Sequence, residues 1–361
     1  MPKYSAPDAF LPAVRRAKAL LFQPFRFSFW CRLALLGLLT GELTAGGCSL
    51  RGNFPAGLGR DRGQQQFFAA SDVWERLAPH FWIIFALGAA FFVLMIVFMY
   101  ISARARFMLF DAIVDADTRL LPAWHKWKNA GANFFLFLLS YTGIVWGLLA
   151  LFVGLPLLIA YATGFNIREH TLTAALGITG MVVVGLTVLV VGTVMYVLVK
   201  DFAVPIMALE GLPVLPALKK LADIIAQQKG SFAGYIGMKI VLTLGAGIVF
   251  GIGTFIIVLP VVLVTAIAAV ISILVGGFAG LTWTPVTIAF AVALGANAVL
   301  GISILVLFGH TPVAAFFPSY ALLYFAGRYA PLHDRLFPPP PPANIAPTPP
   351  PPDLPPQPAI G

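Results

Sequence analysis

Residues 81–102 read FWIIFALGAAFFVLMIVFMYIS, an apolar run without a charged side chain. A helix of about 20 such residues crosses the hydrocarbon core of a bilayer, so this stretch predicts a transmembrane helix. The whole chain has the same character, since 60% of its 361 residues are hydrophobic and only 10% are charged. Ordinary globular domains carry about 25% charged residues. The sequence therefore predicts an all-α integral membrane protein, without a water-soluble stretch long enough for a catalytic domain of its own.

Seven further apolar runs raise the predicted number of transmembrane helices to between six and eight. Arg32 and Glu42 interrupt the first run, and no charge marks the turn that we expect near Gly251, Gly253 or Pro260. The seven runs lie near residues 29–46, 134–161, 172–198, 231–258, 261–277, 286–308 and 313–327.

The distribution of positive charge predicts the orientation in the membrane. The chain carries 23 Lys and Arg residues and a net charge of +9. Lys and Arg accumulate on cytoplasmic loops, and with eight spans most of them fall on the side that holds both termini. We therefore expect both termini in the cytoplasm, an external loop over residues 47–80, and no binding of nucleic acid.

Three segments share one sequence pattern, which predicts an internal repeat. They are LPAVRRA at 11–17, LPAWHKW at 121–127 and LPALKKL at 215–221. Proline is favoured in the first turn of a helix, and apolar residues three and seven places apart with cations between them are typical of a helix in the membrane interface. The predicted architecture is three units, each an interfacial helix followed by a pair of transmembrane helices, and a final apolar hairpin. The first interfacial helix falls within residues 1–28.

The cations of these segments are the candidate ligands for lipid headgroups. Basic residues at the cytoplasmic face are attracted to anionic lipids. The candidates are Arg15, Arg16, Lys126, Lys128, Lys219 and Lys220.

Three ionisable residues lie within predicted spans, where charge is costly and indicates function. Arg32 and Lys239 stand near the cytoplasmic edge, and we expect their long side chains to reach the headgroups. Glu42 follows Arg32 by ten residues, about 15 Å along a helix, so the two cannot pair and Glu42 needs water or another partner. An interfacial position at the end of a short span is the alternative to a proton or substrate site at Glu42.

Two other motifs have structural interpretations. Gly247 and Gly251 are four residues apart in an apolar run, a spacing that lets transmembrane helices pack closely. Asp111 and Asp115 share one helical face, which we expect to be solvated and neutralised by nearby arginines. The proline-rich stretch within residues 331–361 predicts a disordered cytoplasmic tail, with Pro-x-x-Pro spacings for a protein partner as the alternative to a spacer.

Motifs for catalysis and metal binding are missing from the sequence. The five histidines are scattered without an i, i+4 pair, and neither a Gly-x-Ser-x-Gly elbow nor a phosphate-binding loop occurs. We expect no metal, no cofactor, no catalytic residue and no enzymatic activity.

Three passages carry a resemblance to a known group of proteins. They are Pro24-Phe25-Arg26-Phe27, Asp201-Phe202-Ala203-Val204-Pro205-Ile206-Met207 and Ala314-Ala315-Phe316-Phe317-Pro318-Ser319-Tyr320. With them the chain resembles bacterial multi-pass membrane proteins related to the membrane domain of some glycerophosphoryl diester phosphodiesterases. The catalytic barrel of those enzymes is absent, so the resemblance implies no activity. A lipid-engaging or partner-binding envelope scaffold or accessory subunit is the expected function, and a small-molecule or lipid transporter is the alternative.

Overall fold

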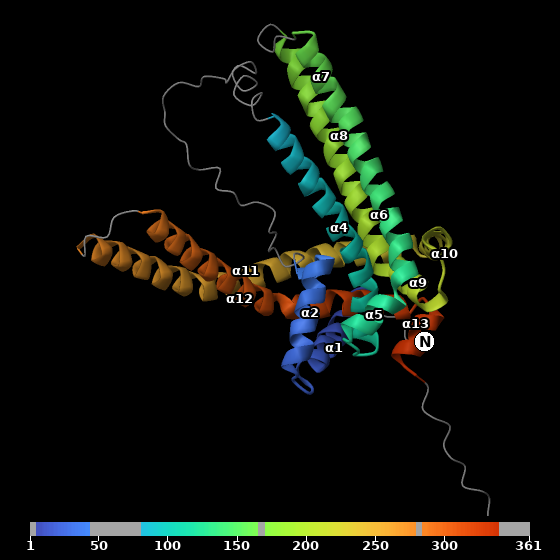
Figure 1. Cartoon of the computed structure of the whole chain (residues 1–361). Coiled ribbons are helices and arrows are strands. Elements are labelled where there is room, and N and C mark those ends of the chain that lie inside the picture. The colour runs from blue at the N-terminus through green and yellow to red at the C-terminus, as the bar shows by residue number, and fades with distance from the viewer. Residues whose placement is uncertain (1–4, 44–80, 165–169, 279–283, 339–361) are drawn as a thin grey trace, which may run out of the picture.

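The computed structural model describes residues 5–43, 81–164, 170–278 and 284–338 (Figure 1). These residues form helices and no strand, so the predicted all-α class is confirmed. Five helical stretches are long and apolar enough to cross a membrane. The helices are α1 (Phe10–Phe22), α2 (Phe27–Thr40), α4 (Phe81–Val114), α5 (Leu120–Lys126), α6 (Lys128–Leu149), η3 (Ala150–Gly154), α7 (Leu155–Ala162), α8 (Thr171–Leu198), η4 (Val199–Ala203), α9 (Val204–Glu210), α10 (Val214–Gln227), α11 (Lys229–Phe278), α12 (Pro285–Ala326) and α13 (Ala330–Leu336).

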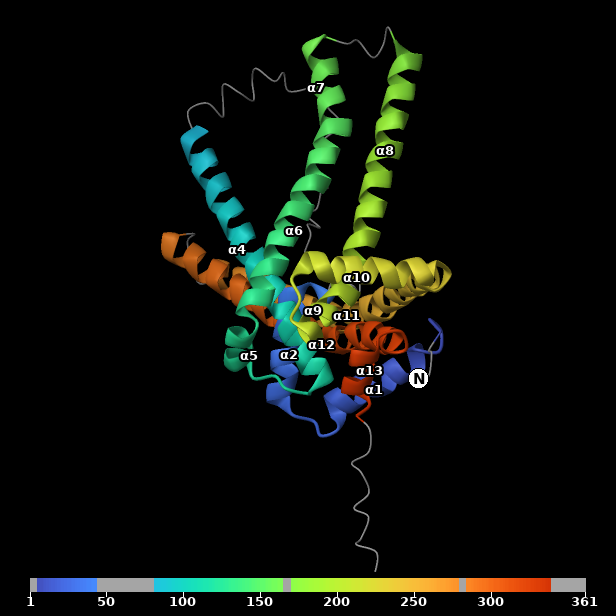
Figure 2. The ribbon, with the colours of Figure 1, turned by 90° about the vertical axis from the view of Figure 1, so that its right-hand side faces the viewer.

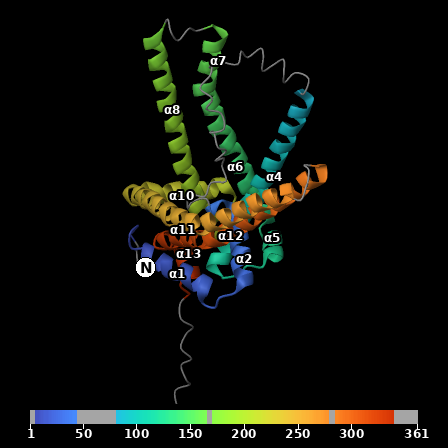
Figure 3. The same cartoon turned by 90° about the vertical axis from the view of Figure 1, so that its left-hand side faces the viewer.

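The long helices form two arms that leave a common base in different directions. Figures 2 and 3 show α4, α6–α7 and α8 fanning upward as the first arm, and α11 with α12 extending sideways as the second arm. The base consists of α1, α2, α5, α9, α10 and α13 together with the inner ends of the long helices (Figure 1). Most side chains buried within the chain lie in the base, whereas the arms expose their large apolar side chains. The apolar pattern of each arm thus matches a lipid environment rather than a protein core.

Two pairs of predicted spans are each one continuous helix. The expected turn near Gly251, Gly253 or Pro260 is wrong, because α11 continues through Pro260. The runs at 286–308 and 313–327 likewise join in α12, which contains Pro312 and Pro318. A transmembrane helix tolerates proline where neighbouring groups and local adjustments satisfy the freed carbonyl. The predicted final hairpin is therefore not a separate element, and α10 is followed by one pair of long helices.

Two further prolines lie beside local π-helical turns. The π-helical segments η3 and η4 directly precede the short helices that contain Pro156 and Pro205. Proline has no N–H for the carbonyl four residues before it, and a wider turn accommodates that missing bond. The helix from Thr171 consequently runs on to Glu210, beyond the predicted end at 198.

The two ends of the membrane region differ from the sequence prediction. Helix α2 has 14 residues, which is about 21 Å and shorter than a hydrocarbon core of about 30 Å. The tail predicted to be disordered from residue 331 begins with helix α13, which packs on the base through buried Leu332 and Leu336. The prediction of disorder is therefore wrong for residues 331–336. These residues precede the proline-rich stretch, and Leu332 and Leu336, four residues apart, give the helix an apolar face. Residues 47–80 and 339–361 lie outside the described part of the chain.

The short amphipathic helices pack against the inner ends of the long helices in a cyclic order. Helix α1 packs on α12, α5 packs on α4, and α10 packs on η4. All three contain the Leu-Pro-Ala pattern, with Pro12, Pro122 and Pro216 at the third helical residue. The division of the chain into repeated units stays a prediction. Each short helix packs on a long helix other than the one that directly follows it in the chain, and the three pairs surround one centre.

A buried charge cluster as the candidate functional site

The centre of the base is formed by the inner ends of three long helices. Residues 103–113 of α4, 198–207 from α8 to α9 and 313–315 with 319–326 of α12 supply most of the buried core. Aromatic rings fill much of it, and Phe202 contacts Phe232 and Tyr235 at centroid distances of 5.3 and 4.9 Å. Charged residues are embedded among these rings, which makes the centre unlike an ordinary apolar core.

Glu42 is the first anchor of this charge cluster. It lies just beyond α2 and is 4% exposed. Its Oε1 lies 2.6 Å from Nζ of Lys200 and 3.6 Å from Nη1 of Arg106. Arg106 also donates from Nη2 to the Thr40 carbonyl at 2.8 Å and to the Tyr196 hydroxyl at 2.5 Å. The end of α2 is thereby tied to both α4 and α8.

Asp201 is the second anchor, and it accepts bonds from α11. Its Oδ2 accepts from the Tyr235 hydroxyl at 2.7 Å and from Nζ of Lys239. Its Oδ1 lies 4.0 Å from Nζ of Lys200, which therefore faces both carboxylates. Asp201 and Lys239 are each 8% exposed. The cluster thus joins α2, α4, η4 and α11 through ionic groups that water barely reaches.

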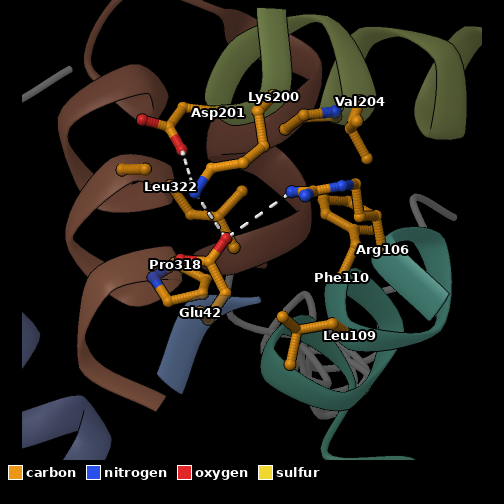
Figure 4. A pocket seen from close by; sticks show the side chains of 11 residues that line it. Glu42, Arg106, Leu109, Phe110, Lys200, Asp201, Val204, Pro318 and Leu322 are labelled. Atoms are coloured by element: carbon orange, nitrogen blue, oxygen red, sulfur yellow. Dashed lines mark ion pairs between the residues drawn. The ribbon is translucent and has the colours of Figure 1, made fainter. Parts of the chain in front are cut away.

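A small cavity opens beside these groups (Figure 4). Its volume is about 50 Å³, and Glu42, Arg106, Lys200 and Asp201 form its polar side. The apolar side comes from α4 and α12, with side chains that include Leu109, Phe110, Pro318 and Leu322. The arrangement holds fixed charges around a space large enough for a small ion or a few waters.

The surrounding cations keep Glu42 ionised. Burial alone would raise the pKa of the Glu42 carboxyl, because the charged form loses its hydration. The charges of Lys200, Lys239 and Arg106 and the hydrogen bond from Lys200 outweigh this effect and lower the pKa to about 2. Glu42 is therefore a fixed anion at neutral pH rather than a group poised to exchange a proton.

The three intramembrane candidates have different environments in the structure. Glu42 finds the partners that the sequence required but did not identify, namely Lys200 and Arg106. The expectation that Lys239 reaches the headgroups is wrong, because Asp201 and Tyr235 hold it inside the base. Arg32 lies on an exposed part of α2, with Nη1 3.5 Å from the Thr118 carbonyl.

The candidate headgroup ligands fall into two sets of three. Arg16, Lys126 and Lys220 make polar contacts within the base, and Arg15, Lys128 and Lys219 are exposed without an ion-pair partner among the described residues. In the first set, Lys126 pairs with Asp111, although we expected Asp111 to be solvated. Asp111 is instead 7% exposed, because the Trp127 indole donates to the same carboxylate oxygen at 2.7 Å and covers it. Headgroup binding by the six cations stays a prediction.

The predicted glycine contact does not form at one of its two positions. A Cβ atom at Gly251 would meet no other atom within 4 Å. Close helix packing by Gly247 and Gly251 stays a prediction. Among the described residues, no group of three or more His, Cys, Asp or Glu side chains is placed to hold a metal ion.

Sequence reasoning missed Arg106, Lys200 and Asp201 as members of one cluster. All three lie near predicted span ends, where cations and carboxylates are normally assigned to the cytoplasmic interface. Asp201 itself gives a signal in the sequence, because it follows a helical run of 28 mostly apolar and small residues by only three positions. A carboxylate so close to an apolar helix is expected to be buried in the membrane or in the base. Nothing local in the sequence links it to Glu42.

A model described as a family of unknown function, DUF7544, matches residues 4–334. The chain belongs to this family. The DUF7544 match extends from α1 to α13 and so includes both arms and the base. No curated protein and no solved structure matches the chain. The relation to the membrane domain of glycerophosphoryl diester phosphodiesterases stays a prediction.

Proposed function

We propose that this DUF7544 protein is a non-enzymatic protein of the bacterial cytoplasmic membrane whose base engages anionic lipid headgroups. In this proposal it serves as an envelope scaffold or accessory subunit, with both termini on the cytoplasmic side. The exposed apolar arms support placement in lipid. The proposed relation to phosphodiesterase membrane domains agrees with a membrane role that needs no catalytic site of its own.

The observation that carries the proposal is a difference between two sets of cations in the base: one set makes contacts within the protein, and the other is exposed. Nη2 of Arg16 donates to the carbonyls of Ile113 and Val114 at 2.9 and 3.3 Å, and so caps the end of α4. Lys126 lies 2.9 Å from Asp111 in the last turns of the same helix. Lys220 pairs with Glu210 at the end of α9. One cation of each short helix therefore fastens that helix to the end of a long helix.

The other three cations have no ion-pair partner among the described residues. Arg15, Lys128 and Lys219 are exposed on or next to the same short helices. Exposed leucines stand at the second residue of each short helix, with Leu11 at 53%, Leu121 at 77% and Leu215 at 76% exposure. An exposed cation near an exposed leucine suits an interface where the cation meets phosphate and the leucine meets acyl chains.

The test compares two triple variants that remove the same charge. In the outward variant, Arg15, Lys128 and Lys219 are replaced by Gln, and in the inward variant Arg16, Lys126 and Lys220 are replaced by Gln. Native mass spectrometry then counts phosphatidylglycerol and phosphatidylcholine molecules retained after gentle release from the membrane. Each cation near an anionic surface contributes about 1 kcal/mol, so we expect the outward variant to retain at least about tenfold less phosphatidylglycerol.

The inward variant is the matched control. It should retain phosphatidylglycerol but unfold at a lower temperature, because its short helices lose their attachment. Equal retention of phosphatidylglycerol by the wild type and the outward variant would contradict the lipid proposal. A second polypeptide found in place of lipid would move the proposal to partner binding, for which the proline-rich residues 339–361 are the candidate segment.

The buried charge cluster favours transport as the second candidate function. Ionisable groups within membrane proteins often mark ion or substrate pathways. The test is ion flux into proteoliposomes, compared between the wild type and Glu42→Gln. Flux above that of empty liposomes that the substitution abolishes would support transport, and flux equal to that of empty liposomes would contradict it.

A further inference from the structure

We propose that the buried charge cluster binds one small monovalent anion of halide size in the cavity between Arg106 and Lys200. This inference goes beyond lipid engagement and does not depend on it. Among the described residues of the cluster there are three cations, Arg106, Lys200 and Lys239, and two carboxylates, Glu42 and Asp201. One positive charge is left over in a centre that is almost closed to water.

Each carboxylate already has a close cationic partner. Asp201 is bound by Lys239 and Tyr235, and Glu42 is bound by Lys200. Arg106 stands 3.6 Å from Glu42, which makes it the most weakly paired cation of the cluster. An unbalanced charge in a medium of low polarity is unfavourable, so an additional anion near Arg106 stabilises the centre.

Arg106 also has unused hydrogen-bonding capacity. The residue is 7% exposed, and its buried Nε atom has no hydrogen-bond partner. Nη2 is occupied by Thr40 and Tyr196. Nε of Arg16 and Nε of Arg104 lack a partner as well, but of the three arginines only Arg106 lines the cavity, where an acceptor can be added.

The cavity has the size for such an acceptor. Its volume of about 50 Å³ lies against both Arg106 and Lys200. That space admits a halide ion or a few waters and excludes bulky organic anions. A metal cation is disfavoured because it would add to the excess positive charge. Leu109, Phe110 and Leu322 form the apolar side of the cavity, and the low polarity of this side strengthens the attraction between the ion and the guanidinium.

The primary experiment follows thermal unfolding of the full-length protein in mild detergent. Sodium chloride replaces sodium gluconate stepwise at constant ionic strength and neutral pH, since gluconate is too bulky for the cavity. We expect Tm to rise with chloride and then to saturate, as binding to the folded state requires. A Tm that does not change with chloride, or that changes without saturation as for a bulk salt effect, overturns the proposal.

Two charge-removing variants then separate anion binding from a purely structural role. Glu42→Gln removes a negative charge beside the cavity, so half-saturation should occur at about tenfold lower chloride. Arg106→Gln removes the excess cation, so half-saturation should occur at about tenfold higher chloride or not at all. A shift in the same direction for both variants, or no shift in either, contradicts the proposal. If either variant fails to fold, the wild-type titration still decides the matter.

Discussion

The same long helices form the arms and the centre of the base, but the arms expose apolar side chains whereas the base buries charged ones. In four of the five long helical stretches, the most apolar window of 18 residues contains no residue buried within the chain. In the base, by contrast, Arg104, Arg106, Asp111 and Asp201 are all less than a tenth exposed. Lipid can cover the arms without specific contacts, whereas the base needs defined partners for every charge. Hydrophobicity therefore accounts for the arms, and paired charges and aromatic contacts define the base.

The largest expected effect comes from breaking an ion pair in the base. Asp201→Asn leaves Lys239 buried without its counter-ion, and loss of one partner of a buried pair costs about 3–5 kcal/mol. We expect a large fall in Tm and in the yield of folded protein. Asp223→Asn makes the same chemical change on the exposed face of α10 and should have no effect. Equal stability of the two variants would remove the distinction between buried and exposed charge.

Acid should weaken the base through Glu42. The pKa of Glu42 is lowered from 4.5 to about 2 in the folded protein. A lowered pKa means that this stabilisation is fully present above about pH 4.5 and is lost as the pH falls toward 2, with a total of about 3 kcal/mol. Tm measured across this range should therefore fall more steeply for the wild type than for Glu42→Gln. Parallel pH profiles would show that the ion pairs of Glu42 contribute nothing to stability.

Two glycines on α6 compare the base and the first arm directly. A Cβ at Gly131 would lie 2.4 Å from Cγ and 3.2 Å from Cα of Arg104, whereas a Cβ at Gly143 would meet nothing within 4 Å. Gly131→Ala should cost about 1–3 kcal/mol through overpacking. Gly143→Ala should be neutral or stabilising by up to about 1 kcal/mol, because alanine is the better helix former. Thermal unfolding of the two variants tests this, and a destabilised Gly143→Ala would show that the arm is packed more tightly than described.

The smallest effect is expected from apolar changes on the arms. Val183 on α8 is 57% exposed, and Val204 at the start of α9 is 4% exposed. Val183→Leu should change the free energy of unfolding by less than about 0.5 kcal/mol, because lipid adapts to the extra methylene. The same change at Val204 should cost about 1 kcal/mol or more in the packed base. Similar losses at both positions, measured as Tm in the same detergent, would contradict the contrast between arms and base.

The sequence predicted the arms better than the base for a physical reason. Helix content and membrane character follow from long apolar runs, which are local properties. The predicted number of spans is too high because the turn expected near Pro260 and the break expected between the runs at 286–308 and 313–327 do not form; apolar surroundings favour continued backbone hydrogen bonding. Glu42 was recognised as needing a partner, but the identity of Lys200 depends on packing between distant helices. Such long-range pairing leaves no periodic signal in a single chain.

We expect both arms to face lipid while the base keeps its charges inside protein. Spin labels at Val183, at Leu263 and at Lys128 test it in a reconstituted bilayer, after Cys31 and Cys48 are replaced by Ala. Val183 and Leu263 are exposed on the first and the second arm, and Lys128 is exposed at the base. We predict that labels on both arms respond to oxygen, which concentrates in lipid, and hardly to a water-soluble nickel chelate, with the reverse at Lys128. A label at Val183 or Leu263 that responds mainly to the nickel chelate would contradict the account.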